Sequence, residues 1–318
     1  MQILASLLAA AVPILFYLFI LWKLDRYEPE PVGQVIKHFL WGAFGAVIFG
    51  IVVSSFFLND NFYIYNSRNV TSTWAVVLIA PFVEEFGKGI FLLWSIKNDY
   101  FDNMTDGMVY GGAVGLGFGM TENFLYFLMY NNNFENWLSI VIIRSLFSAT
   151  MHAIASATFG SMLAIGKFSL TKFKKFFLPF FGFSSAVVFH ALWNYLVSSD
   201  FNYLIGISYM TILIITFLSV YRFSLLSEKK IIINELEEEI YKINFPREHL
   251  SIVSSSKKFR RNWINNTIRK KYVLLATKLA FRKYQAKHSR NLKREYYLTD
   301  VEKYRYELSE IIKEKIVN

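Results

Sequence analysis

The stretch from Pro81 to Trp94, PFVEEFGKGIFLLW, places two adjacent glutamates and a lysine inside an apolar run. A helix that spans the hydrocarbon core of a bilayer needs about 20 mostly apolar residues, and the run Thr73–Ile96 reaches that length. Charged groups at such a depth are rare, costly and typical of functional sites. Glu84, Glu85 and Lys88 are therefore the first candidates for chemistry.

The composition indicates a membrane protein. Of the 318 residues, 54% are hydrophobic and 18% are charged, whereas soluble domains have about 25% charged residues. We therefore expect an all-α, polytopic fold with about seven transmembrane helices. The seven apolar runs lie near Ile3–Leu24, Phe39–Leu58, Thr73–Ile96, Gly107–Tyr130, Trp137–Ile165, Phe176–Val197 and Tyr203–Leu225.

The basic residues predict the orientation and the domains. Lysine and arginine follow the first, third and fifth runs, whereas the loops after the second, fourth and sixth runs contain only Arg68. The positive-inside rule then places the N-terminus outside and the C-terminus in the cytoplasm. We expect a transmembrane domain over residues 1–225 and a basic, helical cytoplasmic tail over residues 226–318. The absence of cysteine excludes disulfides and thiolate chemistry.

Further polar side chains interrupt the fourth, fifth and sixth runs. At a rise of about 1.5 Å per residue, Glu84, Glu122 and His190 fall at similar depths in the outer half of the bilayer, and His152 falls near its middle. The four runs are therefore predicted to bring their polar groups to one level. The polar groups in these three runs are Glu122, Asn123, Arg144, His152, His190 and Asn194.

Structural roles explain part of this set. Lys88 lies one helical turn from Glu84 and is expected to neutralise one of the glutamates. Arg144 is expected to be an interhelical partner rather than a catalytic group. His152 and Asn123 are equally consistent with hydrogen bonds between helices. Two carboxylates and two histidines at one depth are too costly to serve as packing alone.

The chemistry that suits these groups is hydrolysis by an activated water. A carboxyl group in a low-dielectric pocket keeps its proton to higher pH and can serve as a general base near neutrality. An asparagine amide such as that of Asn194 is a typical oxyanion donor. His152, His190 and Glu122 could instead hold a zinc ion, because two imidazoles and a carboxylate form a hydrolytic zinc site. Both mechanisms stay open.

Four motifs occur in the same order as in a known protease family. They are EEFGK at Glu84, FGMTEN ending at Asn123, MHAIASA around His152 and HALWN at His190. With LDRYEPEP after the first run, this series resembles the PrsW intramembrane proteases. These enzymes are distant relatives of the CAAX prenyl proteases and bacteriocin-processing enzymes of the CPBP superfamily. The resemblance covers roughly residues 1–225.

The resemblance implies an intramembrane endopeptidase in a bacterial cytoplasmic membrane. Its substrate would be a membrane-anchored protein similar to an anti-sigma factor, cut on the outer side. Glu84 would activate the water, with Glu85 and Lys88 completing its motif. Glu122, in the motif that begins at Phe118, would be its acidic partner. His190 and Asn194 would polarise the scissile carbonyl, and the role of His152 stays open.

The tail has no counterpart in the resemblance. Ile264, Ile268, Tyr272, Leu275 and Leu279 form an apolar helical stripe opposite lysines and arginines. The stripe predicts either a small helical unit with a solvated basic face, open to a cytoplasmic protein, or an amphipathic helix on anionic lipid. Nucleic-acid binding is disfavoured, because no known motif is present. A capping box at Thr299 and Glu302 predicts the start of a last helix, and His249 and His288 are expected at the surface.

Two functions from other classes use the same residues. A proton-coupled transporter would also bury carboxylates and histidines, but such transporters show internal repeats, and no repeat is evident between the runs. A non-catalytic seven-span sensor would use the basic tail as its output and would have no need of Glu84.

Overall fold

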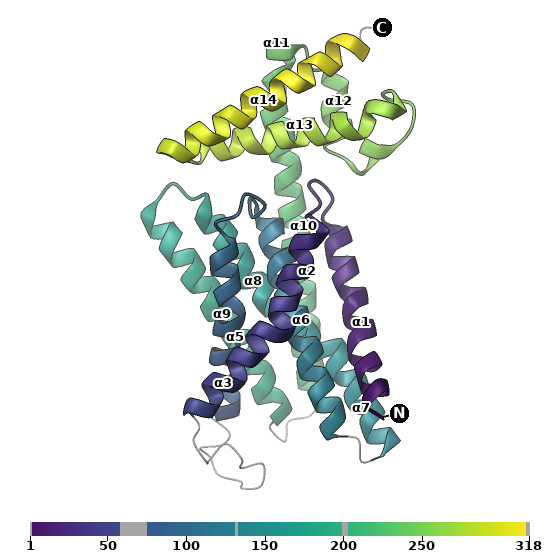
Figure 1. Cartoon of the computed structure of the whole chain (residues 1–318), viewed down its shortest axis with the longest axis vertical. Coiled ribbons are helices and arrows are strands. Elements are labelled where there is room, and N and C mark those ends of the chain that lie inside the picture. Colours follow the sequence, from purple (N-terminus) through teal and green to yellow (C-terminus); the bar gives the residue numbers. More distant parts are fainter. Residues whose placement is uncertain (1, 58–74, 131–132, 199–202, 316–318) are drawn as a thin grey trace. The chain divides into compact units, whose positions relative to one another are not determined.

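The computed structural model describes residues 2–57, 75–130, 133–198 and 203–315, and these residues contain helices and no strand (Figure 1). The all-α prediction is confirmed. The chain divides into two compact units. The first unit comprises Met1–Leu24, Glu30–Lys167 and Phe173–Tyr221, and the second comprises Asp25–Pro29, Phe168–Lys172 and Arg222–Asn318.

Each predicted run corresponds to helix over most of its described residues. Leu58 and Thr73, at the ends of two runs, lie outside the described residues, and the last run extends past Tyr221 into the second unit. Five helical segments are long and apolar enough to cross a membrane: Gln2–Leu24, Val32–Ser55, Phe134–Lys167, Lys172–Ser198 and Leu204–Glu237. The other two runs form the charged helix that contains Glu84 and a buried, glycine-rich helix, so the number seven stays a prediction. The elements are α1 (Gln2–Leu24), α2 (Val32–Leu40), η1 (Trp41–Ala46), α3 (Val47–Phe57), η2 (Ala75–Ile79), α5 (Ala80–Ser95), α6 (Met104–Met129), α7 (Phe134–Ile143), η3 (Arg144–Ser148), α8 (Ala149–Lys167), α9 (Lys172–Ser198) and α10 (Tyr203–Glu237).

Helix α6 is the centre of the first unit, where it contacts α1, α2, η1 and α8. A capping box starts it: the side chain of Asn103 accepts from the backbone N–H of Asp106, and Asp106 Oδ2 accepts from that of Asn103. Its glycines admit the neighbouring backbones. A Cβ atom on Gly115 would lie 2.2 Å from the carbonyl oxygen of His152 on α8. The absence of a side chain there sets the position of α8 beside α6.

The described residues contain three π-helical turns: η1 and η3 interrupt long helices, and η2 directly precedes α5. Such turns break the regular hydrogen-bond ladder and are frequent at functional sites. Two of their carbonyls accept hydrogen bonds from other helices. Thr121 Oγ1 donates to the carbonyl of Ala43 at 2.7 Å, and Asn194 Nδ2 donates to that of Val76 at 3.1 Å. These bonds tie α6 to η1 and α9 to η2.

The second unit is a small helical domain with its own core. It contains the end of α10, followed by α11 (Glu239–Ile243), α12 (Arg247–Val253), η4 (Ser256–Phe259), α13 (Asn266–Lys287) and α14 (Asn291–Lys315). The stripe predicted on α13 lies in this core, where Tyr272 and Leu279 pack with Leu236 and Leu308. A helical unit therefore buries the stripe, and the exposed side of α13 is polar except for Leu274.

The core of the second unit also contains an ion cluster. Glu239 is 0% exposed and accepts from Lys283 Nζ at 2.7 Å and from Arg305 Nε at 2.8 Å. Its buried charge is balanced by the buried Lys283 and the partly buried Arg305, because a lone charge at this depth would be costly.

Two predictions for the tail are wrong. Thr299 does not start a helix, because α14 begins at Asn291 and the hydroxyl of Thr299 donates to the carbonyl of Glu295 one turn before it. His249 is buried rather than at the surface, with Nδ1 lying 2.9 Å from the hydroxyl of Tyr272. The pattern at Thr299 is typical of a helix start, and His249 was expected at the surface. In both cases, packing between segments that are distant in the sequence gives a different result.

Candidate active site

Helix α5 brings three ionisable side chains to the site. Lys88 Nζ lies 2.7 Å from Glu85 Oε1 and 4.0 Å from Glu84 Oε2. Glu85 and Lys88 are buried, whereas 20% of the Glu84 side chain is exposed. The prediction that Lys88 neutralises a glutamate is confirmed, and its partner is Glu85. The two adjacent carboxylates therefore have different environments.

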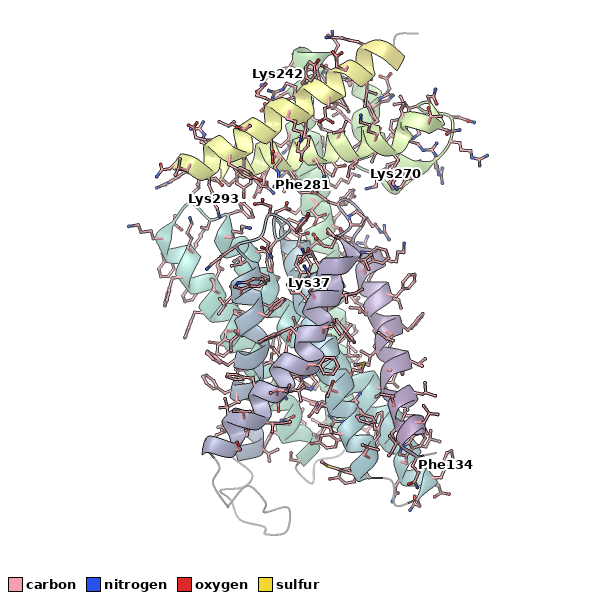
Figure 2. All side chains as sticks on the ribbon, viewed as in Figure 1. Lys37, Phe134, Lys242, Lys270, Phe281 and Lys293 are labelled. Carbon is pink, nitrogen blue, oxygen red and sulfur yellow. The ribbon has the colours of Figure 1, made fainter. Side chains whose placement is uncertain are left out.

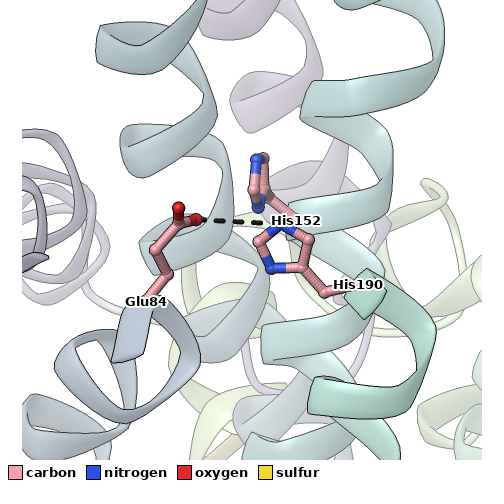
Figure 3. A group of neighbouring side chains, drawn as sticks. All are labelled: Glu84, His152 and His190. Carbon is pink, nitrogen blue, oxygen red and sulfur yellow. Dashed lines mark ion pairs between the residues drawn. The ribbon is translucent and has the colours of Figure 1, made fainter. Parts of the chain in front are cut away.

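His190 on α9 lies between these two carboxylates. Its Nδ1 atom is 3.0 Å from Glu85 Oε1. Figure 3 shows its other contact, in which Nε2 lies 3.7 Å from Glu84 Oε2. Because a carboxylate only accepts hydrogen bonds, the contact with Glu85 places the proton on Nδ1. The lone pair of Nε2 then faces the side on which Glu84 lies.

Helix α6 presents Phe118, Glu122 and Tyr126 on one face, because these residues are four apart. Glu122 Oε2 accepts from Arg144 Nη2 at 2.7 Å, and Arg144 comes from the π-helical turn η3. The guanidinium group of Arg144 lies 3.6 Å from the centre of the Tyr126 ring, and its Nε donates to Asn123 at 3.1 Å. Arg144 thus neutralises Glu122 and joins η3 to α6.

His152 on α8 connects the two halves of the site. Its Nε2 atom lies 2.8 Å from Glu122 Oε2, and its Nδ1 atom lies 2.9 Å from Lys88 Nζ. The ammonium group of Lys88 is 3.9 Å from the centre of the Phe118 ring. The rings of His152 and His190 meet edge to face with their centres 4.7 Å apart. A continuous polar network therefore runs from Arg144 to His190.

The charges of this network are unbalanced. Lys88 lies at contact distance from Glu85, and Arg144 from Glu122. Glu84 has no cation at hydrogen-bonding distance, and its Oε2 atom is buried without a hydrogen-bond partner. With both histidines neutral, the five ionised side chains of the site sum to one negative charge, which belongs to Glu84. A carboxylate in this state attracts a proton or a cation.

Glu84, His152 and His190 are grouped as metal ligands would be. Each offers one ligand atom, and these three atoms lie within 4.8 Å of one another. The sequence suggested Glu122 beside the two histidines. Glu122 Oε2 does lie 2.8 Å from His152 Nε2, but it is paired with Arg144, and the group of possible ligand atoms contains Glu84 instead. The donor set fits zinc, because His190 has a carboxylate on its other nitrogen, as metal-binding histidines usually do. The one competing contact is that of Lys88 with His152 Nδ1.

The remaining candidate from the sequence lies apart from this group. Asn194 is one turn beyond His190, but its exposed amide donates to the carbonyl of Val76. This bond holds α9 against η2, the turn that precedes the Glu84 helix. Asn123 is buried and serves Arg144, as described above.

Sequence reasoning missed two members of the site. Ser156 Oγ donates to Glu85 Oε2 at 3.4 Å, and the Tyr126 ring lies against the guanidinium group of Arg144. The same spacing in the sequence could have identified both Ser156 and Tyr126. Ser156 is four residues after His152, and Tyr126 is four residues after Glu122, so each shares a helix face with a residue that was selected.

Comparison with known proteins identifies the family. Residues 30–221 match the family model described as "PrsW family intramembrane metalloprotease". The chain belongs to the PrsW family. As a member, it is an intramembrane protease and an integral membrane protein.

Curated relatives that share the name Protease PrsW extend the similarity. The protein from Oceanobacillus iheyensis is 26% identical over 238 residues, which are 73% of this chain and 99% of the relative. The protein from Clostridioides difficile is 28% identical over 195 residues, 61% of this chain and 79% of the relative. The protein from Geobacillus kaustophilus is 31% identical over 165 residues, 49% of this chain and 67% of the relative. No solved structure matches the chain.

Proposed function

We propose that this PrsW family member hydrolyses a peptide bond in a membrane-anchored protein, with Glu84, His152 and His190 at the reaction centre. The observation that carries the proposal is the grouping of these three side chains, which come from three helices of the apolar unit. Of the three glutamates in this network, Glu84 has the most distant cation, with Lys88 Nζ 4.0 Å from its Oε2 atom, and its side chain is partly exposed.

The surrounding residues keep the reaction centre in one arrangement. Glu85 fixes His190 through Nδ1, and Glu122 fixes His152 through Nε2. Lys88 and Arg144 balance the charges of Glu85 and Glu122. Glu84 is left to bind a metal or, in a site without metal, to take the proton of the attacking water. Preorganised polar groups of this kind lower the barrier, because they need no rearrangement during the reaction.

We further propose that the site works with zinc, held by Glu84, His152 and His190. The family description as a metalloprotease supports this choice over a metal-free mechanism. When bound, the ion makes a water nucleophilic near neutral pH and polarises the scissile carbonyl. The protein's own part is to supply the donor set and to orient the two imidazoles through Glu85 and Glu122.

The substrate class follows from the location of the site. With the N-terminus outside, the rise per residue predicts Glu84 and His190 in the outer half of the bilayer and His152 near its middle. A single-span protein could bring the outer end of its own helix to this depth. We therefore propose cleavage of a single-span membrane protein on the outer side of a bacterial cytoplasmic membrane.

The test is cleavage of inserted peptides by the purified protein in liposomes. A panel of single-span peptides, and the same peptides without their apolar segments, would be incubated with the enzyme and read by mass spectrometry. We expect cuts only in the inserted peptides, at bonds in the outer half of the span. Cleavage of the soluble peptides alone would contradict the proposed substrate class.

A second arm of the same assay tests the metal. The enzyme would be treated with a strong zinc chelator, dialysed and assayed before and after zinc is returned. We expect activity to be lost with the bound zinc and restored by it, with the zinc content measured separately. Full activity in a preparation that contains no zinc would contradict the proposed zinc dependence, and it would not affect the proposal that the protein is a protease.

A further inference from the structure

The second unit has an uneven charge pattern along its sequence. Residues 249–294 contain fourteen lysines and arginines and no aspartate or glutamate. The acidic residues of the tail lie before and after this stretch. Such a run cannot balance its own charge, so its bases depend on acids elsewhere in the unit or on an external anion.

Four of these bases have internal partners. Lys258 donates to the backbone carbonyls of Arg26 and Tyr27. Arg282 Nε lies 3.0 Å from Asp300 Oδ2. Lys283 and Lys287 bind the acidic turn at the end of α10, each at 2.7 Å from a glutamate oxygen. These four residues hold the unit together and are not available to a partner.

Five of the other bases lie on or next to η4 and on the first turns of α13. Lys257, Arg260 and Arg261 lie on η4 and directly after it, and η4 contacts α13. All five residues that we name the basic face are exposed: Lys257, Arg260, Arg261, Lys270 and Lys271. Among the residues that the structure describes, none of the five pairs with an acidic side chain. Lys270 is labelled on α13 in Figure 2.

Apolar side chains stand among these charges. Leu274 is one turn beyond Lys270 on the same face of α13 and is 45% exposed, and Phe259 is 53% exposed. An exposed leucine next to lysines contributes little to a surface that contacts only water. Surfaces that bind membranes combine bases for the headgroups with apolar side chains that enter the boundary between headgroups and acyl chains.

We infer that the basic face binds anionic lipid headgroups of the bilayer that anchors the chain. Helix α10 runs without interruption from the candidate span into the second unit, so the face is tethered near a membrane surface at all times. Each base near an anionic leaflet adds to the attraction, and the tether keeps the local lipid concentration high. Nucleic acid is also anionic, but the chain is not anchored to it, so we favour lipid as the ligand.

The chain offers a direct test because it contains no cysteine. An L274C variant of the full chain would be labelled with an environment-sensitive fluorophore and reconstituted in nanodiscs of phosphatidylcholine, with or without phosphatidylglycerol. We expect a blue shift and quenching by nitroxide lipids only in the anionic discs. The blue shift and the quenching should both decrease at high salt, because ions screen exposed charges. A label at Y241C, whose parent side chain is 80% exposed on α11, should not respond.

Matched charge reversals locate the contact. Lys270→Glu with Lys271→Glu should abolish the blue shift, whereas Lys293→Glu with Arg294→Glu, which changes the charge equally on α14, should leave most of it. Equal losses would assign the attraction to net charge and overturn the basic face as its source. Equal emission in both kinds of disc would overturn lipid binding altogether. A blue shift on adding an RNA oligonucleotide to neutral discs, with none from anionic lipid, would assign the face to nucleic acid instead.

Discussion

The Nδ1 atom of His190 lies 3.0 Å from Oε1 of Glu85, and this contact decides which nitrogen of the imidazole faces Glu84. The same Glu85 oxygen also accepts from Lys88 at 2.7 Å. One buried carboxylate therefore orients a histidine and neutralises a lysine, and the Oε2 atom of the neighbouring Glu84 is left without a hydrogen-bond partner.

Glu85→Gln tests this division of labour. The amide can still accept from His190, but Lys88 loses its carboxylate and has Glu84 as its nearest remaining anion. We expect cleavage to fall about 10–100-fold, the usual cost of removing a group that supports a metal ligand. Cleavage rate and bound zinc would be measured together. An unchanged rate would show that the Glu85 charge is not needed.

The pair of Arg144 and Glu122 makes a prediction about stability. Arg144→Gln leaves Glu122 ionised and largely buried without its cation, which costs about 3 kcal/mol when a buried pair is broken. Adding Glu122→Gln removes the unpaired charge, so the double variant should recover much of the loss. Thermal unfolding in detergent would compare the three proteins. Additive losses in the double variant would contradict a direct pairing.

Gly115 tests the packing that positions His152. A Cβ at this residue would lie 2.2 Å from the carbonyl oxygen of His152, so Gly115→Ala must separate α6 from α8. Overpacking of this kind costs about 1–3 kcal/mol. The matched control is Gly33→Ala, because a Cβ there meets nothing within 4 Å. We expect lower thermal stability and lower cleavage for Gly115→Ala alone, and equal behaviour of both variants would contradict the close approach.

The pH dependence of the second unit has a defined sign. Burial lowers the pKa of His249 below its usual value of 6.5. Above pH 6.5 the histidine is neutral in both the folded and unfolded states, so burial carries no charge penalty there. Below that pH the unfolded state binds the proton more readily, and stability falls as the pH drops. Amide hydrogen exchange in α12 and α13 should therefore speed up between pH 6.5 and 5, after correction for intrinsic rates.

His249→Gln provides the control for that experiment. The glutamine does not titrate, so its exchange should lose the step in this window even if the overall stability is lower. Glu238 and Glu239 are no alternative source, because lysine and arginine partners hold the pKa of each carboxyl below its usual range. A step of the same size in the variant would assign the pH dependence to another group.

The sequence was sufficient for the helices and for the level of the site, because both depend on local properties. Apolar runs define spanning helices, and a fixed rise per residue places Glu84, Glu122 and His190 at similar depth. The contacts between helices could not be derived in this way. Whether Arg144 pairs with Glu122 or Glu84 depends on helix rotation and on the π-helical turns, which no short pattern in the sequence predicts.

The ligand group shows the same limit. Glu84 and Glu122 are both carboxylates at one depth, and only the structure gives Glu122 its arginine and leaves Glu84 beside His152 and His190. In the tail, the pattern at Thr299 fits a helix start, but the helix had begun two turns earlier. The residues around Thr299 are compatible both with a helix start and with the middle of a helix, and packing within the unit selects the second.

The measurement that tests the central claim most directly is the rate at which Glu84→Gln cleaves an inserted peptide. The control is Glu135→Gln, which changes an exposed glutamate on α7 outside the site. Both variants would be compared with the parent protein at equal folded concentration. The account predicts that Glu84→Gln loses about 10²–10⁴-fold in rate, the usual contribution of a general base, while Glu135→Gln keeps the parent rate. Cleavage by Glu84→Gln at the parent rate would contradict it.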